Sequence, residues 1–352
     1  MGKMEYPDMM SLLVDAPNST IQTAFSKAYG KIHGYLKDDG SSDPFYHRIM
    51  VSVSGGSDSD IMMDFIERIG YPANNVRYVF FDTGIEFAAT KRHLDFLENK
   101  YGVKIQREKA VVPAPLGVKK YGVPFLSKQI SEFINRLQKH GFKWEDKPFD
   151  VLDKEYPKCK AALRWWCNQF GEGSQMNIER KRLLKEFMIA NPPDFLISNK
   201  CCEGAKKKTA HAVEARYNPD LSVQGVRKAE GGARATAYSS CFDHTSSGCD
   251  KLRPIFWFKK EDKIAYEEHY GVQHSDCYAV YGLTRTGCAC CPFGKKFETE
   301  LEAAKLYEPL LYKAAVNVFG KSYEYTRQYR EFVKAHNAES KIEVLADETL
   351  CL

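Results

Sequence analysis

Two groups of residues in this sequence are suited to chemistry: closely spaced cysteines, and a short loop of serine, glycine and aspartate. The chain contains eleven cysteines. Cys201 and Cys202 are adjacent, and two residues separate Cys288 from Cys291. Two such thiolate pairs can close a four-ligand site around one metal ion or one iron–sulfur cluster. Cys290 lies inside the second pair, so it is the less favourable ligand.

The loop, residues 54–59, follows the apolar run 48–53 and precedes a helical pattern. Glycines allow the backbone to approach a phosphate, and the start of a helix offers unpaired N–H groups and a positive dipole end. Asp58 suits a Mg²⁺ ion that accompanies the phosphate, or a cap of the helix. The loop is neither GxGxxG nor GxxxxGK[ST]. The candidate phosphate-binding residues are Ser54, Gly55, Gly56, Ser57 and Ser59.

A second candidate loop, Asp82-Thr83-Gly84, follows the apolar run 76–81. It reads as a helix-capping turn, and a turn at the end of a parallel strand also borders the ligand crevice of an open sheet. Both interpretations hold together, so the two loops are expected to face one site.

The elements that position these loops alternate between strand and helix patterns, which favours βαβ units and an α/β fold with a parallel sheet and helices on both faces. We predict strands at 48–53, 76–81, 103–112 and 220–227. Helices are expected at 17–38, 60–70, 89–102, 131–141, 179–190, 263–271 and 298–336.

The length of 352 residues suits one large domain with additions. We expect a helical extension over 1–45, a nucleotide-binding α/β domain over 46–235 with an insertion near 113–195, and a cysteine-rich, mainly helical part over 236–352.

Composition is that of an ordinary soluble protein, with 43% hydrophobic and 28% charged residues. No apolar run approaches the roughly 20 residues of a membrane span, and the N-terminus does not resemble a signal peptide. A cytoplasmic protein without membrane contact is therefore expected. The net charge of +5 is compatible with an anionic ligand or a nucleic acid.

The loop sequence resembles the PP-loop, S-G-G-x-D-S, of the adenine nucleotide α-hydrolase superfamily. The segment "FFDTGIEF" at 80–87 resembles the Asp-Thr-Gly segment of the phosphoadenylyl-sulfate (PAPS) reductase family. This resemblance implies the fold named above and an adenine nucleotide, either ATP, adenylyl sulfate (APS) or PAPS, bound by both loops.

The cysteine pattern resembles that of the iron–sulfur APS reductases, and three further segments follow the family's order: "CCEGAKKK" (201–208), "QGVRKAEGGAR" (224–234) and "RPIFWFKKEDKIAYEEHYGV" (253–272). The resemblance implies a [4Fe–4S] cluster on Cys201, Cys202, Cys288 and Cys291. It also implies substrate contacts by Arg227 and Arg234. A structural zinc site on the same four cysteines is the alternative, because thiolates bind either metal.

Two departures leave the reaction open. Thioredoxin-dependent relatives carry their nucleophile in a Glu-Cys-Gly setting near the C-terminus, whereas Cys351 here is followed by Leu352. The complete loop resembles that of the ATP pyrophosphatases, in which the aspartate at the position of Asp58 serves Mg²⁺–ATP.

Three function classes therefore compete. The first is a sulfonucleotide reductase with Cys351 as nucleophile and a thioredoxin-like electron donor. The second is an ATP-dependent sulfur or nucleotidyl transferase that modifies nucleic acid, of the tRNA thiolation or DNA phosphorothioation type. The third is a non-catalytic nucleotide-binding regulatory protein. Trp144, Trp165 and Trp166 either stack on nucleic acid or belong to the core.

Overall fold

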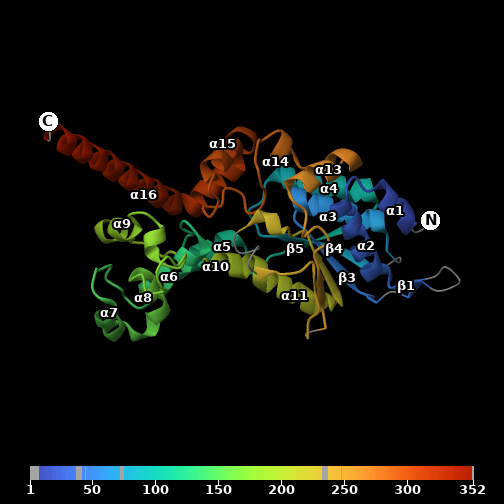
Figure 1. Cartoon of the computed structure of the whole chain (residues 1–352), viewed down its shortest axis with the longest axis horizontal. Coiled ribbons are helices and arrows are strands. Elements are labelled where there is room, and N and C mark those ends of the chain that lie inside the picture. The colour runs from blue at the N-terminus through green and yellow to red at the C-terminus, as the bar shows by residue number, and fades with distance from the viewer. Residues whose placement is uncertain are drawn as a thin grey trace. The chain divides into compact units, whose positions relative to one another are not determined.

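The structure is a computed structural model that describes residues 8–36, 42–43, 45–71, 75–231, 237–246 and 248–350. Side chains are described for all of these except 35–36, 42–43 and 338–350. The chain forms two compact units. The first contains residues 1–111, 205–289 and 306–308, and the second contains 112–204, 290–305 and 309–352. The elements of both units are labelled in Figure 1.

A six-stranded sheet organises the first unit, in the order β5-β4-β3-β6-β8-β7. All neighbouring strands are parallel except β7 and β8, which are antiparallel. The strands are β3 (Ile49–Val53), β4 (Val76–Asp82), β5 (Ile105–Lys109), β6 (Leu221–Gln224), β7 (Phe242–Asp243) and β8 (Asp250–Leu252). The predicted α/β fold with a mainly parallel sheet is confirmed. The short strands β1 (Tyr35–Leu36) and β2 (Ser42–Asp43) form a separate antiparallel pair.

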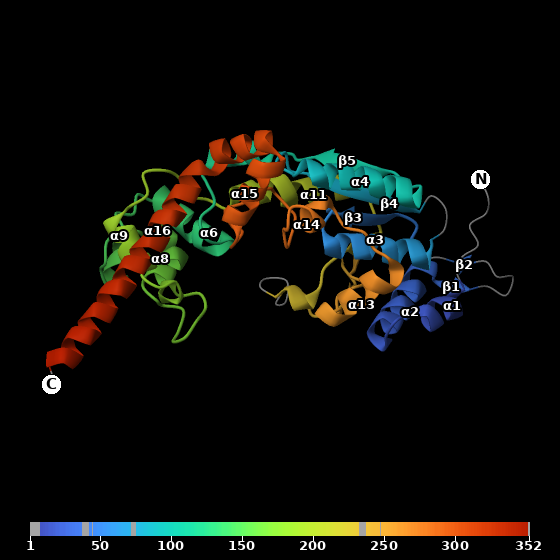
Figure 2. The same cartoon turned by 90° about the horizontal axis from the view of Figure 1, so that it is seen from above.

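Helices cover both faces of the sheet (Figures 1 and 2). The main core lies on one face, where α2 (Ser19–His33), α3 (Ser57–Ile69), α4 (Ala88–Tyr101) and α13 (Lys260–Tyr270) contribute buried side chains. On the other face, Val213 of α11 (Lys208–Tyr217) packs with Met50 and Val79. Successive strand residues thus point to opposite faces, as the pleat requires. The helix α1 (Met9–Asp15) packs against the main core.

The ends of the helices follow local chemistry. Gly70 ends α3 with φ 70° and donates its N–H to the Ile66 carbonyl, and Gly102 ends α4 with φ 64°. Each glycine is the last residue of a predicted helix range, 60–70 or 89–102, and the end of that range is therefore correct to within one residue. The predicted helix 17–38 ends earlier, at His33, because Gly34 leaves the helical conformation with φ 66°.

The second unit is mainly helical among its described residues, with one isolated parallel bridge between Val123 and Ile197. Its helices are α5 (Ala114–Tyr121), α6 (Lys128–Lys139), α7 (Phe149–Glu155), α8 (Lys160–Trp166), α9 (Leu184–Ala190), α10 (Lys200–Cys202), most of α15 (Phe297–Tyr307) and α16 (Pro309–Leu350). Tyr325 of α16 packs against Phe187 of α9 and donates its hydroxyl to the Asn191 carbonyl at 2.7 Å. Trp165 and Trp166 are 2% and 0% exposed, so the structure assigns them to the core rather than to a stacking surface.

The predicted helix 298–336 is divided into α15 (Phe297–Tyr307) and α16. Pro309 has no N–H and disfavours the helical conformation of the residue before it, Glu308. The carboxylate of Glu308 instead accepts hydrogen bonds from the N–H groups of Ala88 and Ala89, at 2.7 and 3.0 Å, at the start of α4.

The two units differ from the predicted division of the chain. The boundary expected near 236 falls inside the first unit, because β7 and β8 extend the sheet beyond β6. The segment 113–195, expected as an insertion, lies in the second unit.

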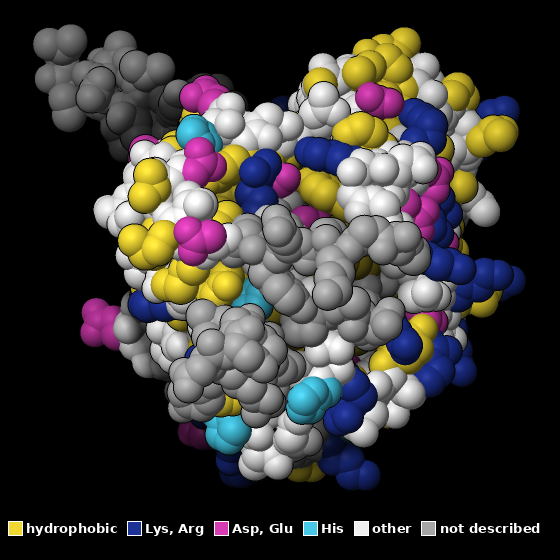
Figure 3. Space-filling view, turned by 90° about the vertical axis from the view of Figure 1, so that its right-hand side faces the viewer, with side chains coloured by type: hydrophobic (Ala, Val, Ile, Leu, Met, Phe, Trp, Pro, Cys, Tyr) yellow, Lys and Arg dark blue, Asp and Glu magenta, His cyan; other side chains and the backbone are white. Residues whose placement is uncertain are grey.

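Charged side chains of both signs are mixed over the face seen in Figure 3, which agrees with the modest net charge. Within the described residues, no helix combines the length and the apolar character that crossing a bilayer requires.

Candidate functional site

The serine–glycine loop lies where β3 ends and α3 begins. Ser59 Oγ accepts a hydrogen bond from the Ser54 N–H at 2.8 Å, which closes the loop on itself. The N–H of Ser57, the first helical residue, donates to the Tyr278 hydroxyl at 2.9 Å. The next two N–H groups, of Asp58 and Ser59, precede the first intrahelical bond and have no helical partner. The loop thus presents backbone donors and the positive end of a 13-residue helix.

Close packing explains both glycines of the loop. Gly55 has φ 65°, and a Cβ there would lie 2.7 Å from Thr90 Cγ2 of α4. A Cβ on Gly56 would lie 2.9 Å from Thr286 Oγ1 and 3.4 Å from the Tyr278 hydroxyl. The loop is therefore held against its surroundings at a distance that larger residues do not allow.

Two cations converge on the carboxylate of Asp58. Arg227 Nε lies 2.9 Å from Asp58 Oδ1, and Lys263 Nζ of α13 lies 3.0 Å from the same oxygen. Lys263 also donates to Ser57 Oγ. All three charged side chains are at most 17% exposed. The predicted Mg²⁺ ligand is thus ion-paired here, and two positive side chains stand beside the phosphate-type loop.

Gly225, at the end of β6, allows this convergence. A Cβ at this position would lie 3.0 Å from the Asp58 carbonyl oxygen and 3.2 Å from Ser59 Cα. The end of β6 therefore packs directly on the first turn of α3, which brings Arg227 to Asp58. Glycine here serves a close approach of two backbones.

The second loop extends from β4, next to β3. Parallel pairing of Val53 with Phe80 places both loops at the carboxyl edge of the sheet, as predicted. Asp82 accepts from the Gly84 N–H at 2.9 Å and lies 3.3 Å from Lys91 Nζ. Thr83 Oγ1 lies 3.2 Å from Cys288 Sγ, so a predicted metal ligand is in contact with the second loop.

Glu86, which the sequence analysis did not select, forms an acid pair with Asp82. Burial raises the pKa of Glu86 to about 7, assisted by its hydrogen bond with Asp82. Burial opposes ionisation of Asp82 as well, but hydrogen bonds from Glu86 and Gly84 and the charge of Lys91 lower its pKa. Below about pH 7 the pair therefore holds one proton, which belongs mainly to Glu86.

A chain of alternating charges runs from the loop into the unit. Lys263 Nζ lies 3.6 Å from Glu267 Oε1, and Glu267 lies 2.7 Å from His274 Nε2. His274 Nδ1 lies 2.8 Å from Asp60 Oδ2 of α3, which is fully buried. Burial disfavours the charged imidazole, but hydrogen bonds with Asp60 and Glu267 outweigh it and raise the pKa of His274 to about 9. This chain holds Lys263 against the loop.

The predicted cluster ligands are divided between the units: Cys288 belongs to the first, and Cys201, Cys202 and Cys291 to the second. In the part of the chain that the structure describes, no cysteine forms a disulfide. No group of three or more His, Cys, Asp and Glu among those residues is identified as a metal site. The chemistry of the four thiols still suits a thiolate-bound metal or cluster.

Cys290 differs from its neighbours. It is 0% exposed, and its Sγ lies 3.5 Å from the Glu300 carbonyl oxygen. Two other predicted residues, Arg234 and Cys351, lie outside the described residues.

The structure thus brings the loop residues 54–59 and Arg227 together, and places Asp82-Thr83-Gly84 at the same edge. Sequence reasoning missed Lys263, His274, Tyr278 and Glu86. A signal for Lys263 was its place inside the segment 253–272, which resembles a family motif. Glu86 lies in the same way inside the segment 80–87, whereas His274 and Tyr278 carried no local signal.

One family model matches the part of the chain that contains both loops. Residues 48–141 match the family model of the phosphoadenosine phosphosulfate reductase domain. An uncharacterized 37.8 kDa protein from the gpa 5′ region of Escherichia phage 186 is 24% identical over 253 residues, which is 71% of this chain and 68% of that protein.

Two solved structures are similar at low identity. Phosphoadenylyl-sulfate (PAPS) reductase from Candida auris, in a phosphate complex, is 12% identical, with 82% of this chain and 97% of that chain covered and a TM-score of 0.39. The U34-tRNA thiolase NcsA from Methanococcus maripaludis, with its [4Fe–4S] cluster, is 14% identical, with 90% and 80% covered and a TM-score of 0.37.

Proposed function

Because this chain carries a phosphoadenosine phosphosulfate reductase domain over residues 48–141, we propose that it is an enzyme that binds an adenine nucleotide at the loop 54–59 and acts in sulfonucleotide reduction. One observation carries the proposal: backbone N–H groups at the start of α3 meet Lys263 and Arg227 at the carboxyl end of β3. This arrangement suits the phosphates of a nucleotide.

In this proposal each group has a separate role. Gly55, Gly56 and Ser59 supply the backbone cradle. Lys263 and Arg227, which are paired with Asp58, turn their donors to phosphate or sulfate oxygens. Asp82, Thr83 and Gly84 border the nucleotide from the second loop, and Arg234 adds a further guanidinium.

For the reductase, the substrate is APS or PAPS and Cys351 is the proposed nucleophile. Its thiolate attacks the sulfur of the sulfate group, an S–S bond forms, and the nucleotide leaves with the bridging oxygen. A dithiol of a thioredoxin-like donor then reduces the S–S bond, which releases sulfite and leaves the donor as a disulfide.

The second candidate is an ATP-dependent sulfur or nucleotidyl transferase that modifies nucleic acid. Asp58 favours it, because a carboxylate in a phosphate loop suits Mg²⁺ that accompanies ATP. In that case Asp58 exchanges its ion pairs for the metal, and Lys263 and Arg227 bind the phosphates. A non-catalytic nucleotide-binding protein would use the same residues without turnover.

We further propose that Cys201, Cys202, Cys288 and Cys291 bind one [4Fe–4S] cluster. The support is the spacing of two thiol pairs in a chain without disulfides among its described cysteines. When bound, a cluster supplies charge that helps to position an anionic nucleotide. Zinc on the same thiolates is the alternative.

Nucleotide binding is tested with Gly56→Val, in which the added side chain fills the cradle. Titrations with ATP, APS and PAPS on anaerobically purified protein should show weaker binding of the preferred nucleotide. Gly30→Val is the matched control, because a Cβ at Gly30 of α2 meets nothing within 4 Å. If wild type and Gly56→Val bind every adenine nucleotide with equal affinity, the loop does not bind phosphate and is only a turn between β3 and α3.

The reaction is tested with Cys351→Ser. Loss of sulfite release from APS or PAPS supports the reductase. If Cys351→Ser keeps full activity and the protein cleaves ATP between its α- and β-phosphates, the reductase is rejected and the ATP-dependent transferase is supported. Binding of nucleotide without turnover of any of the three would favour the non-catalytic protein.

A further inference from the structure

A cavity of about 570 Å³ lies at the other edge of the same sheet. Its walls come from the residues before and at the start of β3, β4 and β5, and from the end of α11. All of these belong to the first unit. The volume lies within the range of about 300–1,000 Å³ that is typical of small-molecule sites.

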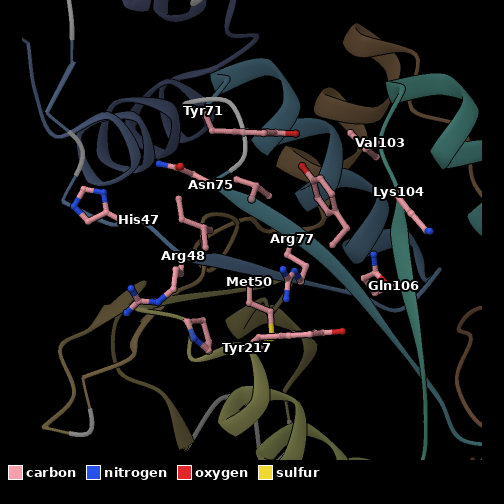
Figure 4. A pocket seen from close by; sticks show the side chains of 14 residues that line it. His47, Arg48, Met50, Tyr71, Asn75, Arg77, Val103, Lys104, Gln106 and Tyr217 are labelled. Atoms are coloured by element: carbon pink, nitrogen blue, oxygen red, sulfur yellow. The ribbon is translucent and has the colours of Figure 1, made fainter.

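Basic side chains surround this cavity, and three of them, Arg48, Arg77 and Lys104, carry a positive charge. Figure 4 shows His47 and Arg48 on one side, Lys104 on the opposite side, and Arg77 between them. The fourteen described residues that line the cavity include no Asp or Glu. The wall therefore concentrates positive charge without an acidic residue of its own.

Arg77 and Lys104 form no direct ion pair with the described residues, and their acidic neighbours Glu108 and Glu98 interact with them only at longer range. Arg48 lies 3.9 Å from Asp220 at the surface, whereas no carboxylate of the described residues lies within ion-pair distance of His47, Arg77 or Lys104. Arg77 is held in another way: its guanidinium lies 4.1 Å from the ring centre of Tyr217. Tyr217 is itself fixed, because its hydroxyl donates to Glu108. Arg77 is thus positioned while its N–H donors stay available for a ligand.

Amide and aromatic groups complete the wall. Gln106 lies beside Lys104, and Asn75 lies beside Tyr71 (Figure 4). The Tyr71 hydroxyl donates to Glu67 at 2.8 Å, which fixes a half-buried ring at the cavity. Amides can hydrogen-bond the edge of a nucleobase, and a fixed aromatic ring can stack on it.

We propose that this cavity is a second binding site, for a nucleoside phosphate, separate from the loop 54–59. The phosphate contacts Arg77, Lys104, His47 and Arg48, and the base contacts the amides of Asn75 and Gln106. The ligand is either a free nucleotide or one nucleotide of a nucleic acid strand, since both present the same groups.

The two sites do not overlap. β3 spans five residues, Ile49–Val53, between the cavity and the loop. At about 3.3 Å per residue the two edges are about 15 Å apart. A substitution in one site therefore leaves the groups of the other in place, and the second site does not depend on the proposed function.

The test uses the loop variant Gly56→Val as background, so that the first site is blocked. Binding of AMP is measured by calorimetry, and binding of a short, fluorescently labelled oligothymidylate strand by anisotropy. Arg77→Gln with Lys104→Gln should weaken binding of the ligand by at least about tenfold, because each charged hydrogen bond contributes about 1.5 kcal/mol or more. For the strand, the salt dependence should also become shallower, by about 0.7 per lost phosphate contact.

Two further variants keep the test specific. Lys158→Gln with Lys181→Gln removes the same charge from exposed positions of the second unit and should leave binding unchanged. Lys104→Glu reverses one exposed charge without disturbing the stack of Arg77 on Tyr217, and should also weaken binding. Binding of AMP identifies a free nucleotide, and binding of the strand alone identifies nucleic acid. The second site is refuted if neither AMP nor the strand binds the Gly56→Val protein. It is also refuted if the cavity substitutions leave the affinity of that protein unchanged.

Discussion

Gly225→Ala offers a sharp test of how the candidate site is assembled. Gly225 directly follows β6, and the added methyl group would lie 3.0 Å from the Asp58 carbonyl oxygen, 3.2 Å from Ser59 Cα and 3.3 Å from the Asp58 carbonyl carbon. All three neighbours are backbone atoms of the first turn of α3. They cannot rotate away as the end of a long side chain would.

The size of the effect follows from this geometry. The optimal separation of non-bonded carbon atoms is about 3.5–4.0 Å, so α3 and β6 must move apart by a few tenths of an ångström. Overpacking of this kind costs about 1–3 kcal/mol of unfolding free energy. The same movement shifts the loop N–H groups and separates Arg227 from Asp58. Loss of one charged hydrogen bond to phosphate should weaken nucleotide binding about tenfold or more.

Urea denaturation and a nucleotide titration measure the two effects on the same protein. Gly30→Ala is the matched control: it adds the same methyl group inside α2, where nothing lies within 4 Å. It should keep nucleotide affinity and raise stability by up to about 1 kcal/mol, because alanine favours the helix. A Gly225→Ala protein with wild-type stability and affinity would refute the close packing of β6 on the loop.

His274 has its pKa raised to about 9, so its stabilising contribution is complete below about pH 6.5 and disappears as the pH rises through 9. His274→Gln should flatten that part of the stability curve in urea denaturation, and an unchanged curve would contradict the pairing with Asp60 and Glu267. Glu86 has its pKa raised from 4.5 to about 7, so its contribution is complete below 4.5 and disappears as the pH rises through 7. Melting temperatures measured between pH 4.5 and 7 should fall with rising pH in the wild type, and Glu86→Gln should remove this fall. The same pH dependence in both proteins would exclude the acid pair. Anaerobically purified protein should contain about four irons per chain, and Cys288→Ser should lose them in metal analysis. If the wild-type protein is colourless and contains one zinc per chain, the four cysteines form a zinc site and not a cluster site.

The sequence by itself predicted the parts whose signal is local. The alternation of apolar runs at 48–53 and 76–81 with helical patterns predicted parallel strands, and hence two loops at one edge of a sheet. Glycine at 70 and at 102 predicted where α3 and α4 end. These features depend on backbone preferences and on periodicity over a few residues, which a single sequence contains.

Other features carried no such signal. β7 and β8 are two and three residues long, too short for a period-two pattern. Trp165 and Trp166 lie in a segment whose basic residues left stacking on nucleic acid and burial as alternatives, and only packing showed that both are buried.

The tertiary structure alone decided which groups surround the loop. Lys263 reaches Asp58 from 205 residues away, and Tyr278 reaches Ser57 from 221 residues away. Contacts of this range depend on how α13 and α14 (Asp276–Ala279) pack on the sheet, and no local pattern records that packing. The same holds for the shared proton of Asp82 and Glu86, since a pKa is set by burial and neighbouring charge rather than by residue type.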